Sequence, residues 1–125
     1  MNTRTQPAAV AVALAYHHAW TAGDFELAMT HIAPEIVCLS PAGRIDGADA
    51  FRRFMAPFMT ILVRSELLAA YGDELTAVLI YNPETAPVKE APTCELITVE
   101  GGRIAQMRII FDRQPFDAAR RAAAS

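Results

Sequence analysis

The last apolar run of the chain, residues 102–112, constrains its fold more than any other segment. A Gly-Gly turn precedes this run, and its side chains alternate between the two faces of a β-strand. Met107, Ile109 and Phe111 therefore share one face, whereas Asp112 belongs to the other. The face that points inward decides whether this strand forms an apolar or a charged wall, and a one-residue bulge would exchange the two faces.

Helical patterns begin the chain. Alanine-rich residues 7–22 predict a first helix, and residues 24–31 predict a short second helix that Pro34 ends. Residues 48–58 predict a third helix with a strong apolar face, which Pro57 kinks or ends.

Strand patterns dominate the rest of the chain. A strand is expected at residues 35–40, and an antiparallel sheet at residues 61–71, 75–82, 93–100 and 102–112, with a proline-rich loop or broken edge strand at 83–92. Helices followed by a meander of strands predict an α+β fold, with the helices packed on one face of a curved sheet. Such a sheet encloses a cavity, and cavities of this kind are the usual sites of small-molecule binding.

Length and composition favour a single domain over residues 1–125, with a core from about 10 to 116. Hydrophobic residues make up 53% of the 125 residues, enough to bury a substantial core. The net charge of −3 argues against a nucleic-acid-binding surface, which is normally basic. No apolar run reaches the roughly 18 residues of a membrane span, and the N-terminus lacks a secretion signal. We therefore expect a cytoplasmic protein.

The common catalytic and cofactor motifs are absent from the sequence, including Gly-rich phosphate loops, nucleophile elbows and paired-cysteine zinc sites. Cys38 and Cys94 lack metal-ligand spacing and fall within strand-like runs, so we expect buried free thiols. Adjacent His17 and His18 point about 100° apart on a helix and are expected on its surface. No metal and no organic cofactor is implied.

Several short segments occur along the chain in a characteristic order. The first helix ends in Ala-Trp-Thr-Ala-Gly-Asp-Phe (19–25), Ser40-Pro41 follows the first strand, and Ile-Asp-Gly (45–47) precedes the third helix. Glu-Gly-Gly-Arg-Ile (100–104) then leads into Ile-Phe-Asp-Arg-Gln-Pro-Phe (110–116). In this order the segments resemble the SnoaL-like branch of the nuclear transport factor 2-like superfamily. That branch includes polyketide cyclases, ketosteroid isomerases and limonene-epoxide hydrolases.

The resemblance implies a cone-shaped fold, also described as a cystatin-like α+β barrel. A curved antiparallel sheet would pack against three N-terminal helices, with a pocket at its wide end and homodimers formed through the outer sheet face. Members of this superfamily share a fold but not a reaction, so the function depends on the site itself.

The ketosteroid isomerase pattern implies three positions in this chain. Its hydrogen-bonding tyrosine falls on Tyr16, and its general-base aspartate falls on Ser40. Its second acid falls on or beside Cys94, with Glu95 one residue away. Serine is a poor base for abstracting a proton from carbon, so this chain lacks the base that the isomerase reaction needs.

The limonene-epoxide hydrolase pattern implies a different set of charges. Its last-strand aspartate falls on Ile109, and its arginine and second aspartate fall around Leu79 and Tyr81. None of the three charges is therefore retained, and Asp112 lies one residue beyond the face that would line the pocket.

We expect an apolar pocket that binds a hydrophobic, ring-containing metabolite, in a homodimeric protein. The expected lining residues are Trp20, Phe54, Phe58, Leu79, Tyr81, Cys94, Met107, Ile109 and Phe111. Any catalysis would depend on Tyr16, helped by Ser40 or Glu95. One alternative is an isomerase, cyclase or hydrolase that acts on a polyketide-, terpenoid- or steroid-like substrate through Asp112 or Glu95. Another is a non-catalytic dimerisation module whose own side chains fill the cavity.

Overall fold

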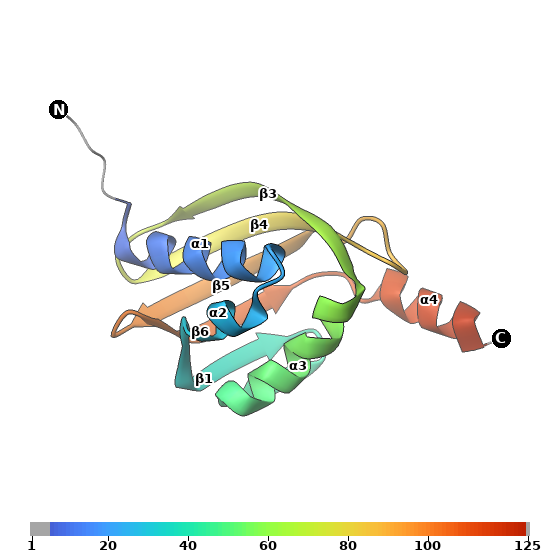
Figure 1. The fold of residues 1–125 in the computed structure, drawn as a ribbon, viewed down its shortest axis with the longest axis horizontal. Coiled ribbons are helices and arrows are strands. Elements are labelled where there is room, and N and C mark those ends of the chain that lie inside the picture. The colour runs from blue at the N-terminus through green and yellow to red at the C-terminus, as the bar shows by residue number, and fades with distance from the viewer. Residues whose placement is uncertain (1–5, 125) are drawn as a thin grey trace.

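A curved six-stranded sheet carries the helices on one of its faces (Figure 1). The structure is a computed structural model that describes residues 6–124. In chain order its elements are α1 (Ala8–Thr21), α2 (Phe25–Met29), β1 (Ile32–Ser40), β2 (Gly43–Asp46), α3 (Ala48–Ile61), β3 (Leu62–Gly72), β4 (Thr76–Thr85), β5 (Thr93–Glu100), β6 (Arg103–Ile110) and α4 (Gln114–Ala124).

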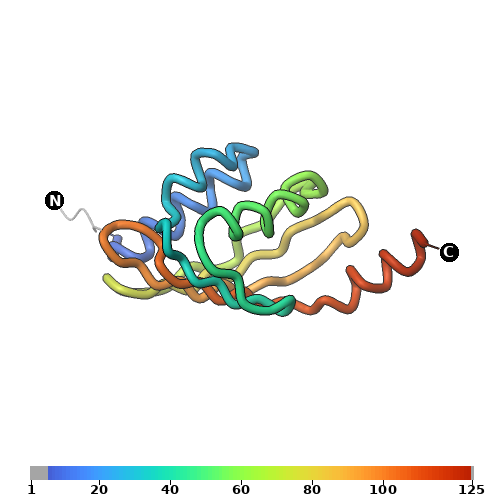
Figure 2. Tube along the Cα trace, turned by 90° about the horizontal axis from the view of Figure 1, so that it is seen from below, coloured from blue at the N-terminus to red at the C-terminus, as the bar shows by residue number. Residues whose placement is uncertain are grey.

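The strand order across the sheet is β2-β1-β6-β5-β4-β3. Figure 2 shows α1, α2 and α3 together on one side of the sheet, which confirms the expected α+β fold. The pairing differs from the expected antiparallel meander at one place, because β1 runs parallel to β6. Strands β2 and β3 form the two edges and do not pair with each other in the described residues, so the curved sheet stays open.

Three prolines do not interrupt their elements as expected. Pro34 lies inside β1, where the pairing with β6 shifts register between Ile32 and Val37 and leaves room for a residue without an N–H. Pro83 lies inside β4 beyond Tyr81, the last β4 residue paired with β5, so its missing donor leaves no β5 acceptor unpaired.

Helix α3 continues through Pro57 to Ile61, four residues beyond the proline. A proline within a helix removes one backbone hydrogen bond and frees a carbonyl one turn earlier. Pro57 and Arg53 are both exposed, so water can bind the freed carbonyl and the helix need not end there.

Helix α1 is held at its N-terminus by the turn between β3 and β4. Pro7 precedes the helix and provides no side-chain cap. The Ala8 N–H donates to Glu74 Oε2 at 2.8 Å, and the Ala9 N–H donates to the Asp73 carbonyl at 3.2 Å. Because the first N–H groups of a helix lack intrahelical partners, this turn replaces the missing cap and anchors the helix on the sheet.

The same turn depends on the absence of a side chain at Gly72. The Asp73 N–H donates to the Thr76 carbonyl at 2.8 Å, and Asp73 Oδ1 accepts from the Leu75 and Thr76 N–H groups. These bonds hold the backbone so close that a Cβ on Gly72 would lie 2.2 Å from the Thr76 oxygen.

Replacing Gly72 by alanine is therefore expected to lower the free energy of unfolding by about 2–3 kcal/mol, in the range of severe steric substitutions. Gly101→Ala is the control, because Gly101 has φ +58° and open space around it. That change should lose only about 1 kcal/mol, from the left-handed backbone. Urea unfolding of the two variants compares them, and equal losses would contradict a steric role for the turn.

Candidate functional site

A cavity of about 570 Å³ opens between α3, the inner face of the sheet and α4. Helix α3 contributes Phe54 and Phe58, which lie one helical turn apart and therefore point the same way. Strand β6 and the residues after it contribute Ile109 and Phe111 from the opposite wall. Aliphatic and aromatic side chains form most of its surface, and the protein's own side chains leave the space open.

The pleat of β6 follows the expected alternation. Met107 and Ile109 are buried on the inner face, whereas Arg108 and Ile110 are exposed on the outer face. The pairing of β6 with β5 shifts register only between Thr98 and Val99 among the described pairs, well before the end of the strand. The apolar wall is therefore present as predicted, without the bulge that would have turned Asp112 inward.

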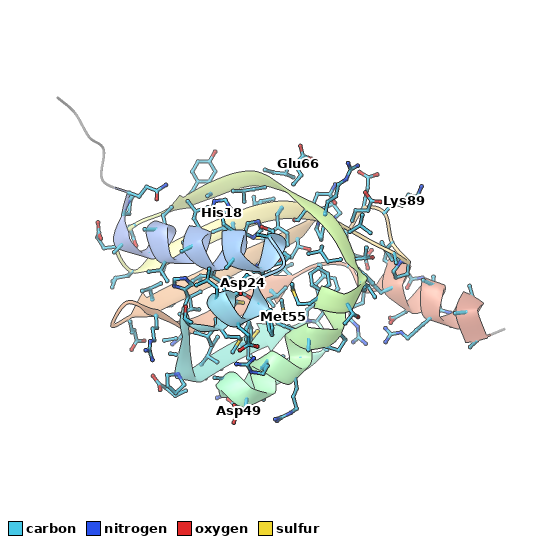
Figure 3. The ribbon with its side chains drawn as sticks, viewed as in Figure 1. His18, Asp24, Asp49, Met55, Glu66 and Lys89 are labelled. Carbon is cyan, nitrogen blue, oxygen red and sulfur yellow. The ribbon has the colours of Figure 1, made fainter. Side chains whose placement is uncertain are left out.

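Five of the expected lining residues border the cavity: Phe54, Phe58, Tyr81, Ile109 and Phe111. Three others are buried in the core next to it and do not border the space: Trp20, Leu79 and Met107. Figure 3 shows the side chain of Met55 on α3, which borders the cavity although it was not expected, whereas Asp49 on the same helix points away.

Cys94 does not line the cavity, which corrects the expected register of β5. It pairs with Ile80 and Ile110, two exposed residues of the outer sheet face. Glu95 instead pairs with the buried residues Leu79 and Ile109, so its carboxyl group lies on the inner face. Glu66, a glutamate of β3, is exposed (Figure 3).

Ser40 has a structural partner and lies outside the cavity. Its Oγ donates to the Gly43 carbonyl at 3.2 Å and accepts from the Ala42 N–H at 3.1 Å. The hydroxyl therefore closes the turn between β1 and β2, and its hydrogen is already bonded within that turn.

Asp112 is exposed and also lies outside the cavity. Its Oδ1 accepts a hydrogen bond from the Gln114 N–H at 2.9 Å, where α4 begins. An acceptor at a helix N-terminus satisfies one of the unpaired N–H groups there. Asp112 thus starts α4.

Glu95 is fully buried beneath the cavity and carries the most perturbed carboxyl group of the chain's described part. Tyr81 lines the cavity, and its hydroxyl donates to Glu95 Oε2 at 2.5 Å. Burial raises the pKa of Glu95 to about 7, although the Tyr81 hydrogen bond acts in the opposite direction. The carboxyl group therefore changes its charge close to neutral pH.

Helix α1 covers this carboxyl group with three aromatic side chains, Tyr16, His17 and Trp20. The ring of Tyr81 has its centroid 4.8 Å from that of His17 and 5.4 Å from that of Trp20. Burial, and then the charge of Glu95, raises the pKa of Tyr16 well above its usual value. We call these three residues, together with Tyr81 and Glu95, the buried polar cluster.

His17 was expected on the helix surface, and this prediction is wrong, because only 2% of His17 is exposed. Burial, and to a smaller extent His18, lowers its pKa to about 4, so His17 is neutral at physiological pH. The spacing held a signal: Ala13, Tyr16, His17 and Trp20 occur at i, i+3, i+4 and i+7, the pattern of one buried helix face.

The buried polar cluster has hydrogen-bonding capacity that the protein does not use. Within residues 6–124, the buried atoms Tyr16 Oη, His17 Nδ1, Trp20 Nε1 and Glu95 Oε1 have no protein partner. Buried polar atoms of this kind are rare in folded proteins, and a concentration of them around one carboxyl group is typical of functional sites.

Metal ligands do not converge anywhere in the described part of the chain, where no group of three His, Cys, Asp or Glu side chains could hold an ion. Cys38 and Cys94 are both free, and burial raises the pKa of Cys38 to about 12. No helix of residues 6–124 is long and apolar enough to span a membrane.

A close structural match exists in a protein from Kribbella flavida DSM 17836, known from its crystal structure. It is 61% identical over 94% of this chain and 97% of that one, with a TM-score of 0.91. No curated protein matches the chain.

More distant structures share the fold. A putative polyketide cyclase from Sinorhizobium meliloti is 20% identical over 80% of this chain and 94% of that one, with a TM-score of 0.71. TerC, co-crystallised with polyporic acid, is 17% identical over 90% of this chain and 97% of that one, with a TM-score of 0.74.

The model of the SnoaL-like domain family matches residues 13–107, most of the chain. This match includes α1 from residue 13 onward, α2, α3 and the strands that carry Tyr81 and Glu95. The chain therefore belongs to the SnoaL-like family, and its open, curved sheet has the nuclear transport factor 2-like fold.

Proposed function

We propose that the protein binds a hydrophobic, ring-containing small molecule in the cavity beneath α3. The cavity's volume of about 570 Å³ carries this proposal, since it falls in the usual range for small-molecule sites, about 300–1,000 Å³. Walls made by Phe54, Phe58 and Phe111 suit flat apolar rings. Tyr81 is a polar point within them, with its hydroxyl bonded to Glu95.

The names of distant relatives support the same class of ligand. The Sinorhizobium meliloti protein is called a putative polyketide cyclase, and TerC was crystallised with polyporic acid. A polyketide-like or terpenoid-like metabolite is therefore the class that we propose for this chain. Its free thiols, Cys38 and Cys94, fit a reducing compartment and support a cytoplasmic location.

A second candidate function is catalysis through Glu95, as an isomerase, cyclase or hydrolase. The observation that favours it is the carboxyl group's pKa of about 7, next to the cavity-lining Tyr81. Once Glu95 is protonated, it can donate to Tyr81 Oη and release the tyrosine hydrogen to bond a substrate oxygen. Such a reaction should slow as the pH rises above about 7 and should be lost in Glu95→Gln.

Homodimer formation through the outer sheet face is also proposed. Ile80, Leu96 and Ile110 are exposed on the adjacent strands β4, β5 and β6, and Tyr71 extends this surface on β3. Contiguous apolar surface on a folded domain is typical of a protein–protein interface, and a twofold axis lets one such patch pack on its own copy.

The cavity proposal predicts that the neutral two-ring probe methyl 2-naphthoate binds and quenches the single tryptophan, Trp20. Trp20 reports on the cavity because its ring contacts Phe58 at a centroid distance of 5.7 Å. Ile109→Phe should weaken binding about tenfold, or about 1.4 kcal/mol, by filling the cavity. Its control is Ile110→Phe on the outer face, which should bind like the wild type in calorimetry. Equal affinities in both variants would place the probe elsewhere.

The protonation of Glu95 predicts a pH dependence of stability. Its folded pKa of about 7 exceeds the ordinary 4.5, so the folded state binds the proton more tightly. Its contribution to the free energy of unfolding therefore falls as the pH rises from about 4.5 to about 7, by about 3 kcal/mol. His17 has the opposite sign, because its folded pKa of about 4 lies below the ordinary 6.5.

Glu95→Gln should accordingly gain stability relative to the wild type as the pH rises through this window, which urea unfolding at several pH values measures. The histidine contribution, no longer opposed, should then make the variant's stability rise with pH between about 4 and 6.5. The exposed glutamate supplies the control, since Glu66→Gln should run parallel to the wild type. Stability profiles of both variants that run parallel to the wild type would mean that Glu95 is ionised in the folded protein throughout this pH window.

The dimer proposal predicts that Leu96→Glu yields a monomer, because a charge would be buried at the centre of the interface. Leu27→Glu is the matched control, with 50% of Leu27 exposed on α2 and 43% of Leu96 exposed on β5. Sedimentation equilibrium of the two variants distinguishes the surfaces. A wild-type monomer, or a dimer that survives Leu96→Glu, would contradict this interface.

A further inference from the structure

The polar side chains that line the cavity differ in whether their hydrogens are already used. The Thr60 hydroxyl donates to a carbonyl of α3 at 2.7 Å, and the Thr93 hydroxyl donates to the Ala91 carbonyl at 2.7 Å. The Tyr81 hydroxyl donates to Glu95. A hydroxyl has a single hydrogen to donate, so these three groups can only accept a hydrogen bond from a ligand while Glu95 is ionised.

The free donors in the lining are the guanidinium groups of Arg113 and Arg120. Arg113 Nη1 donates to the Pro41 carbonyl at 3.2 Å, and within residues 6–124 no carboxylate forms an ion pair with Arg113. A guanidinium group has five N–H hydrogens, so most of those of Arg113 remain available. Arg120 contacts Asp117 at 2.7 Å in an exposed pair, of the kind that contributes little and can be exchanged.

Both arginines lie at the end of the cavity that α4 borders. Figures 1 and 2 show α4 extending beyond the sheet, past the loop between β4 and β5. On α4, Phe116 and Ala119 line the cavity beside Arg120. No aspartate or glutamate of the described residues lines the cavity. Its walls are therefore apolar inside and cationic at this end, although the chain as a whole has a net charge of −3.

We infer that the ligand is an amphipathic acid, whose rings occupy the apolar cavity and whose carboxylate or acidic enol oxygen binds Arg113 and Arg120. This inference rests on the proposed small-molecule function and adds the charge of the ligand and its direction of entry. The rings enter first and the acidic group stays beside α4. Guanidinium groups suit this role because they bind planar oxyanions through paired N–H groups and remain charged at any physiological pH.

Two probes that share the same rings and differ in charge test the inference. 2-Naphthoate carries a carboxylate, whereas methyl 2-naphthoate has the same rings and no charge. Calorimetry of the wild-type protein at low salt should show the acid binding about tenfold more tightly than the ester, as expected for two exposed ion pairs. This preference should shrink at high salt, because dissolved ions screen exposed charges.

The variants Arg113→Gln and Arg120→Gln should each reduce the ratio of acid affinity to ester affinity, and together they should bring it close to one. Arg103→Gln removes the same charge at the other end of β6, outside the cavity lining, and should keep the wild-type ratio. Equal binding of acid and ester by the wild type, or a ratio that survives the double substitution, would overturn the inference and leave the cavity proposal intact. Binding of neither probe would contradict both proposals.

Discussion

The burial of one carboxyl group determines much of the arrangement around the cavity. Glu95 lies on the inner face of β5 with no exposed surface, and such a group is stable there only if it is protonated or well hydrogen-bonded. Tyr81 provides the hydrogen bond from the neighbouring strand, and α1 seals the group from water with Tyr16, His17 and Trp20. Tyr81 also lines the apolar cavity. The same side chain therefore contacts both the cavity and the buried carboxyl group.

Folding redistributes a proton within this cluster without requiring a net charge in the interior. In an unfolded chain at mildly acidic pH, a glutamate is largely ionised and a histidine is largely protonated. In the folded protein burial reverses both, since the pKa of Glu95 rises to about 7 and that of His17 falls to about 4. Two neutral groups replace two opposite charges, and the interior behind the cavity becomes uncharged. The charged side chains that line the cavity and could orient a ligand are Arg113, just before α4, and Arg120, within α4.

Periodic features of the chain could be predicted from the sequence, and long-range pairings could not. The shared face of Met107 and Ile109 follows from strict strand alternation, and the α+β class follows from the order of helices and strands. The register of β5 depends on its pairing with β4 and β6, where Glu95 lies opposite Leu79 and Ile109, so the residues of β5 alone did not reveal that Glu95 rather than Cys94 faces inward. Burial of His17 was not predicted, because a histidine is usually polar enough to lie on the surface. Its position on the apolar face of α1 would have indicated the opposite.

The parallel pairing of β1 with β6 has a consequence for how the chain is made. Ile32 lies opposite Ile104, so β1 cannot pair with β6 until some seventy further residues have been synthesised. Until then one edge of β1 pairs with β2, and its other edge has no strand to pair with. The inner strands of the sheet cannot close around β1 before translation of the domain is almost finished. A nascent chain of this topology therefore exposes an unpaired strand edge until β6 is made, and chaperones act on surfaces of this kind.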